Sequence, residues 1–103
     1  MSLNQSVLIC DHVNPTLKEI LEKNGLKVTY EPEITPEQIA EKIGNFQVVV
    51  IRGRTKLPRE LIEKADKCKI IARVGVGLDN IDQEAAKEKN IRVITQLRAQ
   101  SLQ

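Results

Sequence analysis

Apolar runs of strand length alternate with helical patterns along the whole chain. The five apolar runs are Val7–Cys10, Lys27–Tyr30, Val48–Ile51, Ile70–Ala72 and Arg92–Ile94. Helical spacing of apolar residues fills the intervals between them. Such alternation is typical of right-handed βαβ units and predicts a parallel sheet. We therefore expect an α/β fold: a flavodoxin-like, doubly wound, five-stranded parallel sheet in three layers.

Capping residues mark where the predicted helices begin and end. Asn14 precedes a proline, and Thr35 starts the capping box Thr-Pro-Glu-Gln. Gly25 and Gly44 are expected to end the first two helices. Asn90 is expected to end the last helix in a left-handed conformation. The β-branched run Val48–Ile51 predicts a central strand that is buried on both faces.

Composition limits the function to a small set of classes. The 103 residues suffice for one domain, expected over residues 1–94, with a polar tail over residues 95–103. The net charge of +2 comes without a clustered basic run, which argues against nucleic-acid binding. No stretch approaches the roughly 20 apolar residues of a membrane span, so a cytoplasmic protein is expected. Cys10 and Cys68 form no metal pattern and are expected to be buried reduced thiols.

Candidate binding residues follow the third and fourth predicted strands. Ligands of open parallel sheets bind beyond the carboxyl ends of the strands. Arg52, Arg54 and Arg73 would bring positive charge to this edge, and guanidinium groups bind carboxylates and phosphates in bidentate fashion. Gly75 and Gly77 would let backbone amides approach an anion. The pattern predicts a site for a small anion, although arginines that merely solvate the surface or pair with acids would leave the same pattern.

Other chemistries find less support in the residues. The Gly-x-Gly loop is not a dinucleotide fingerprint, because Asn80 stands where the third glycine belongs. Asp11 and His12 are adjacent, but neighbours along a strand point to opposite faces, so a catalytic dyad is not expected. Asp79 and Asp82 are interpreted as turn and cap residues. No catalytic residue and no metal site is predicted.

Two segments span the ends of the third and fourth predicted strands and the loops after them. They are Ile51–Lys56, Ile-Arg-Gly-Arg-Thr-Lys, and Ala72–Asp82, Ala-Arg-Val-Gly-Val-Gly-Leu-Asp-Asn-Ile-Asp. They resemble the motifs Val-Arg-Ser-Ala-Thr-Lys and Gly-Arg-Ala-Gly-x-Gly-Val-Asp-Asn-Ile-Asp of the D-2-hydroxyacid dehydrogenase family. The resemblance covers roughly residues 5 to 94. Gly53 replaces the family's usual serine, and Arg54 replaces a small residue.

The resemblance implies a substrate-binding lobe for a small anionic 2-hydroxy or 2-oxo acid. It implies that Arg52 holds the anionic groups, that backbone amides contact the carboxylate, and that neighbouring side chains line or support the loops. The residues it assigns to the site are Arg52, Gly53, Thr55, Arg73, Val74, Gly75 and Asn80. Arg54 is expected to add positive charge.

The resemblance also implies what this chain lacks. Family members continue after the fifth strand with a Rossmann domain that binds NAD and carries the catalytic residues. Residues 95–103 match nothing in that pattern, so no cofactor is expected in this chain and NAD only in the parent. The lobe alone is expected to bind weakly and to be inactive. The alternative is a truncated or engineered flavodoxin-like scaffold that self-associates through exposed apolar surface, as a homodimer or a swapped dimer.

Overall fold

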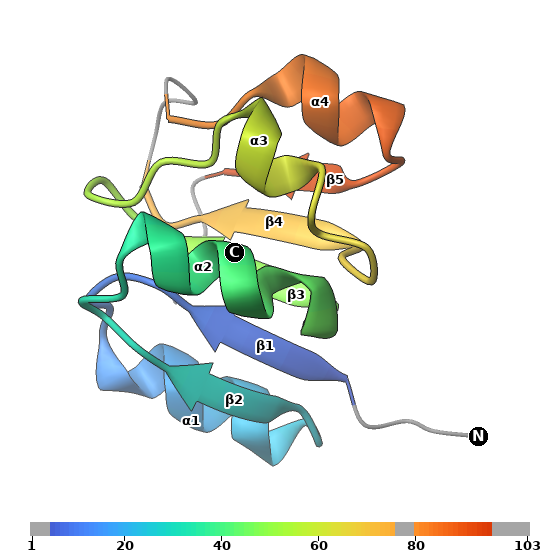
Figure 1. Cartoon of the computed structure of the whole chain (residues 1–103). Coiled ribbons are helices and arrows are strands. Elements are labelled where there is room, and N and C mark those ends of the chain that lie inside the picture. Colours follow the sequence, from blue (N-terminus) through green and yellow to red (C-terminus); the bar gives the residue numbers. More distant parts are fainter. Residues whose placement is uncertain (1–4, 76–79, 96–103) are drawn as a thin grey trace.

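Five parallel strands and the helices between them form a three-layer α/β structure (Figure 1). The computed structural model describes residues 5–75 and 80–95. The strands are β1 (Ser6–Ile9), β2 (Lys27–Tyr30), β3 (Val48–Ile51), β4 (Ile70–Arg73) and β5 (Arg92–Ile94). The helices are α1 (Pro15–Lys23), α2 (Pro36–Lys42), the 3-10 turn η1 (Ile43–Asn45), α3 (Arg59–Ile62) and α4 (Gln83–Glu88).

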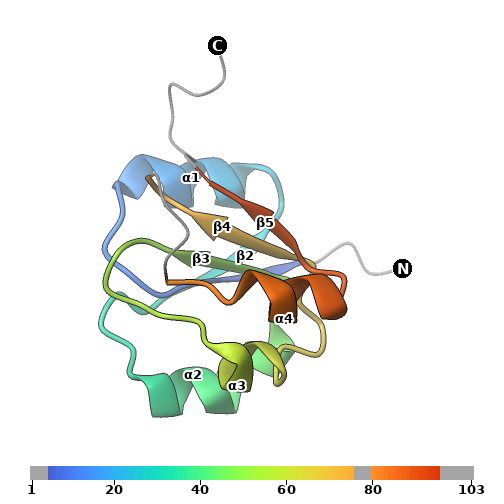
Figure 2. The same cartoon turned by 90° about the horizontal axis from the view of Figure 1, so that it is seen from above.

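The strand order β2-β1-β3-β4-β5, with every pair parallel, confirms the flavodoxin-like prediction. Helix α1 covers one face of the sheet, and α2, α3 and α4 cover the other (Figure 2). The order reverses between β1 and β3, because the chain first builds outward to β2 and then returns to the other side of β1. The carboxyl ends of β1, β3 and β4 therefore lie side by side at one edge.

The central position of β3 is confirmed by its burial. Val49 and Ile51 pack into the larger core cluster with α2, α3 and α4, whereas Val50 packs into the smaller cluster beneath α1. All three side chains are at most 1% exposed. Since fully burying one such side chain stabilises a fold by about 1.5–3 kcal/mol, this short strand anchors both layers.

The predicted caps form, with one exception in how a helix ends. The Asn14 side chain accepts a hydrogen bond from the Thr16 amide at 2.8 Å, and the Thr35 capping box is complete. Asn90 adopts the left-handed conformation with φ of 61°. Gly44 does not end α2 through a positive φ but lies within η1. A Cβ there would approach the Lys64 carbonyl oxygen to 2.9 Å, so a close backbone contact explains this glycine.

Element boundaries shift by one or two residues from the predicted ones. Strand β1 ends at Ile9, although the Cys10 amide still donates to the Val50 carbonyl at 2.9 Å. Strand β4 extends to Arg73, and α4 ends at Glu88. Among the described residues, no helix has the length and apolar character needed to cross a membrane. The expected tail beyond Ile94 lies almost wholly outside the described residues.

Cys10 and Cys68 are free and buried, as predicted. Burial, with a contribution from the Asp11 carboxylate, raises the pKa of Cys10 to about 12. Burial likewise raises the pKa of Cys68 to about 11. Both values exceed the ordinary 9.0 of a cysteine thiol, so the folded state holds both protons more tightly than the unfolded state does.

This difference predicts a loss of stability in alkali. A raised thiol pKa stabilises the fold fully below pH 9.0, and the effect is lost as the pH rises towards the folded values of about 11 and 12. For Cys10 alone, the free energy of unfolding should fall by roughly 1–2 kcal/mol between pH ~9 and pH ~10.5. Urea unfolding of the wild type and of a C10A/C68A variant at both pH values measures this, and identical pH slopes would contradict it.

Candidate anion-binding site

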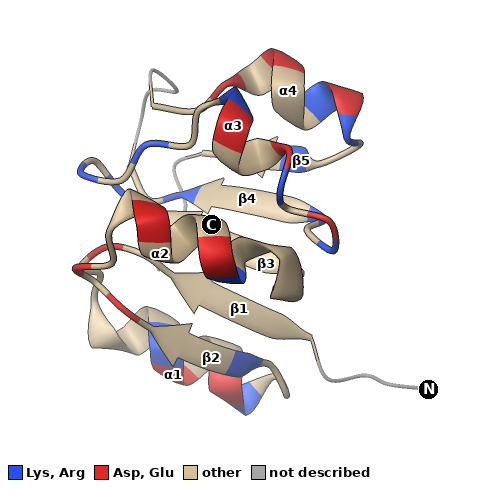
Figure 3. Ribbon diagram, in the orientation of Figure 1, with Lys and Arg blue, Asp and Glu red and all other residues tan. Residues whose placement is uncertain are grey.

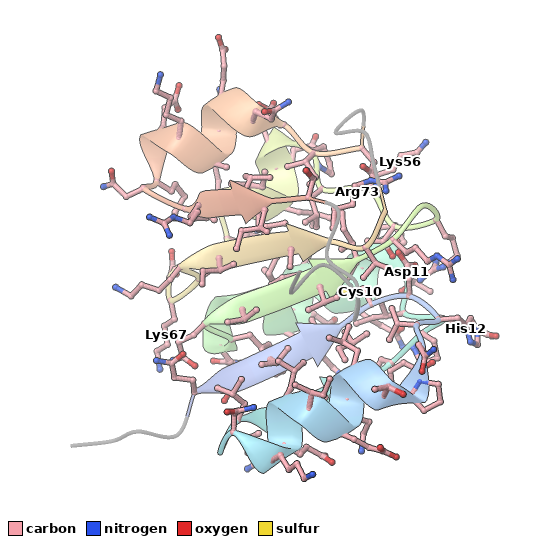
Figure 4. All side chains as sticks on the ribbon, turned by 180° about the vertical axis from the view of Figure 1, so that it is seen from behind. Cys10, Asp11, His12, Lys56, Lys67 and Arg73 are labelled. Carbon is pink, nitrogen blue, oxygen red and sulfur yellow. The ribbon has the colours of Figure 1, made fainter. Side chains whose placement is uncertain are left out.

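The predicted site residues gather at the carboxyl edge of β1, β3 and β4. Figure 3 shows basic segments in the loop after β3 and at the end of β4, next to acidic positions in the loops after β1 and β2. Viewed from behind, Asp11, His12, Lys56 and Arg73 lie at this edge, whereas Lys67 lies at the opposite one (Figure 4). The sheet topology thus brings charges from four loops together.

Asp11 follows β1 and is the centre of this edge. Its carboxylate is buried, with the residue only 2% exposed. Oδ2 accepts hydrogen bonds from the backbone amides of Arg52 at 2.6 Å and Thr55 at 3.2 Å. Oδ1 accepts a hydrogen bond from Thr55 Oγ1 at 2.7 Å and lies 3.1 Å from Arg54 Nε. One buried carboxylate therefore binds the loop after β3 at both of its ends.

Arg54 does not add free positive charge to the anion site, contrary to expectation. Besides its ion pair with Asp11, its Nη2 donates to the carbonyl oxygens of Cys10 at 2.7 Å and Ile34 at 3.1 Å. Its side chain also borders a cavity of about 280 Å³ with apolar walls from Ile34 and Leu61. The charge is balanced by Asp11, and the guanidinium joins the loops after β1, β2 and β3.

Arg52 is exposed at the tip of the same loop. Its backbone amide is fixed by Asp11, while its side-chain Nη1 makes a long 3.3 Å hydrogen bond to the His12 carbonyl oxygen. The adjacent Gly53 is exposed as well, and a Cβ built there meets nothing within 4 Å. A guanidinium on an anchored backbone with open space beside it is suited to bind an anion.

Asn80 links the loop after β4 to the loop after β3. Its Nδ2 donates to the carbonyl oxygens of Arg52 at 2.9 Å and Thr55 at 2.8 Å, and its Oδ1 accepts from Arg73 Nε at 3.1 Å. Its backbone carbonyl accepts from the Leu57 amide at 2.7 Å. Through these contacts Arg73 and Asn80 hold the two loops together, and their expected part in substrate binding stays a prediction.

Gly75 is the glycine whose conformation this edge requires. Its φ is +112°, and a Cβ there would lie 2.9 Å from Arg73 Nη1. Arg73 Nη1 also donates to the Val74 carbonyl at 3.1 Å, which holds the start of the loop against β4. Gly77 and Asp79, which the sequence also placed in this loop, lie outside the described residues. The binding roles of Val74 and Gly75 stay predictions.

His12 and Asp11 do not form a dyad. The His12 side chain is exposed, with Nε2 3.3 Å from Glu33 Oε2, whereas Asp11 points into the protein. Asp82 caps α4 by accepting from the Ala85 amide at 2.9 Å, as predicted. Within residues 5–75 and 80–95, no three metal-ligating side chains come together.

From the sequence, Asp11 was interpreted only as a neighbour of His12, and its role in this hydrogen-bond network was not predicted. A signal was present in the sequence. An acidic residue just after β1, the neighbour of the central strand β3, can accept hydrogen bonds from the backbone amides of the loop after β3. Thr55 supplied a second signal, since a buried hydroxyl in that loop needs a partner.

The chain is similar in sequence to a family of dehydrogenases. The family model described as "D-isomer specific 2-hydroxyacid dehydrogenase, catalytic domain" matches residues 7–100, which extends six residues past Ile94 into the segment expected to lie outside the family. D-3-phosphoglycerate dehydrogenase of Methanocaldococcus jannaschii is 44% identical over 96 residues, 93% of this chain and 18% of that protein. Hydroxypyruvate reductase of Thermotoga maritima is 40% identical over 88 residues, covering 81% of this chain and 28% of that protein.

Solved structures agree in fold. PH0520 of Pyrococcus horikoshii superposes with a TM-score of 0.85 at 28% identity, over 90% of this chain and 28% of that one. An NAD+-bound 3-phosphoglycerate dehydrogenase of Entamoeba histolytica gives 0.79 at 32% identity, over 89% and 32%. This chain thus spans about a fifth to a third of the length of these relatives. From the family match and these identities, the chain belongs to the D-isomer-specific 2-hydroxyacid dehydrogenases and corresponds to part of their catalytic domain.

Proposed function

We propose that this chain is the substrate-binding lobe of an NAD-dependent D-3-phosphoglycerate dehydrogenase. Such an enzyme oxidises 3-phosphoglycerate to 3-phosphohydroxypyruvate. The identity of 44% to one such dehydrogenase and 32% to the human enzyme supports this choice within the family. The 40% identity to a hydroxypyruvate reductase also supports a small 2-hydroxy or 2-oxo acid as the substrate. A cytoplasmic location belongs to the same proposal.

The observation that carries the proposal is the exposed Arg52 guanidinium on a fixed loop. We assign Arg52 to the anionic groups of the substrate, through charge-assisted and bidentate hydrogen bonds. The backbone around Val74 and Gly75 would face the carboxylate, because Gly75 keeps side-chain bulk away from this part of the edge. Arg73 and Asn80 hold the two loops in register and act on the substrate only through them.

The dinucleotide does not fit this edge. A fingerprint for NAD needs a third glycine where Asn80 stands, and the Asn80 amide is already bound to two carbonyl oxygens of the neighbouring loop. Replacing that side chain by hydrogen would separate the loops. We therefore assign the residues of this edge to binding and orienting the substrate, and not to hydride transfer.

Replacement of Arg52 should weaken binding without unfolding the lobe. We expect Arg52→Gln to raise the dissociation constant for 3-phosphoglycerate by about tenfold or more, because a charge-assisted contact is lost. Arg92→Gln is a matched control, since Arg92 is also exposed but begins β5 at the opposite edge. Chemical-shift titration of the labelled chain measures both constants. Equal effects of the two substitutions, or no saturable shifts in the wild type, would refute the assignment.

The 103-residue chain alone should bind but not catalyse. Oxidation of the substrate requires a bound cofactor and an acid–base group held against it, whereas the residues assigned here, Arg52 and the backbone near Gly75, only bind the substrate. Incubation with 3-phosphoglycerate, NAD and a trap for the oxo-acid product should therefore give no NADH absorbance. A full-length phosphoglycerate dehydrogenase in the same assay verifies the conditions, and measurable turnover by this chain would disprove the claim.

We also propose that the chain self-associates as a homodimer through the edge at β5. Within the described part of the chain, β5 pairs only with β4, and Ile94 at its end is 36% exposed. Exposed apolar residues on an edge strand favour association. Sedimentation should show a dimer at high concentration that Ile94→Lys shifts towards monomer, whereas Ile20→Lys on α1, also at an exposed position, should not. A wild-type chain that stays monomeric throughout would rule the dimer out.

A further inference from the structure

We infer that Asp11 is a positioning residue that determines where Arg52 presents its guanidinium. The inference rests on the proposed function of Arg52 and deepens it. Asp11 would not touch the substrate, because its carboxylate is buried and fully engaged by the loop after β3. It acts through the backbone that carries Arg52.

The geometry fixes the loop at both ends from one side chain. Asp11 Oδ2 binds the amide of Arg52 at 2.6 Å and the amide of Thr55 three residues later at 3.2 Å. The Thr55 hydroxyl divides its contacts between Asp11 Oδ1, at 2.7 Å, and the Cys10 carbonyl, at 3.1 Å. Only Gly53 and Arg54 lie between these two anchored residues, so the backbone of this segment has few alternative conformations.

Arg54 completes this arrangement by balancing the charge of Asp11. A buried carboxylate beside an anion site would repel the ligand unless its charge were balanced. Arg54 Nε lies 3.1 Å from Asp11 Oδ1 and supplies that balance. The two arginines therefore have different roles. Arg54 neutralises the carboxylate and links the loops, while the guanidinium of Arg52 is free to bind the ligand.

This division predicts coupled effects on binding. Asp11→Asn keeps the size of the side chain but removes the charge, and its NH2 group cannot accept from the loop amides. Arg54→Gln leaves the acid unbalanced next to the bound anion. Each substitution should raise the dissociation constant for 3-phosphoglycerate by about tenfold, since it disturbs a charged hydrogen-bond network. Because both substitutions act through one network, the double variant should raise the dissociation constant by a factor well below the product of the two single factors.

A second pair of variants separates positioning from folding. Thr55→Val removes the hydroxyl that donates to Asp11 but keeps the amide, whereas Thr55→Ser keeps both donors. We expect weakened binding for the valine variant and near-wild-type binding for the serine variant, each measured under conditions in which the variant is fully folded. These two variants decide the question if Asp11→Asn does not fold.

The measurements are the dissociation constant from chemical-shift titration and the hydrogen-exchange rate of the Arg52 amide. Positioning by Asp11 predicts faster exchange at Arg52 in Asp11→Asn and in Thr55→Val, but not in Thr55→Ser. Folded Asp11→Asn with unchanged exchange and unchanged affinity would overturn the inference. If the wild type itself does not bind 3-phosphoglycerate, the proposed function fails, and the exchange rates alone then decide whether Asp11 holds the loop.

Discussion

The carboxyl edge of this sheet depends on one buried carboxylate. Asp11 is 2% exposed, yet each oxygen has two donors within 3.2 Å, and all four donors come from the loop after β3. Leaving such a group without partners in the interior would cost several kcal/mol, so the loop is held to the conformation that satisfies it. The position of Arg52 follows from a requirement of the core, not from contacts of its own side chain.

The strand order explains why this requirement arises at the edge where a ligand would bind. In doubly wound sheets, a crevice opens where the strand order reverses, and here that point lies between β1 and β3. Asp11 lies in the loop after β1 and Arg52 begins the loop after β3, so the hydrogen-bond and ion-pair network spans the switch point. Asn80 then extends the connection to the loop after β4 through the carbonyl oxygens of Arg52 and Thr55. Three strands that are distant in sequence thereby support one small surface.

Much of the fold could be predicted because its signals are local. The run Val48–Ile51 identified the central strand, and the capping box at Thr35 located the start of α2. The site was harder to predict from the sequence, because its main hydrogen bonds join residues that are more than 40 positions apart. Arg54 illustrates the difficulty: from sequence it resembles one more cation of an anion site, and only the tertiary contact with Asp11 reveals a structural charge. Gly44 is a similar case, because the carbonyl that approaches it belongs to residue 64.

The two departures from the family pattern have different physical meanings once the contacts are known. Arg54 fits because its long side chain reaches the carbonyl oxygens of Cys10 and Ile34, which a small residue could not bind. Gly53 has neither a left-handed φ nor a neighbour that a Cβ would strike, so the backbone does not require a glycine there. What Gly53 changes is the open volume beside Arg52. Arg54 therefore links the loop to the neighbouring loops beneath its tip, and Gly53 leaves open space beside Arg52 at the tip.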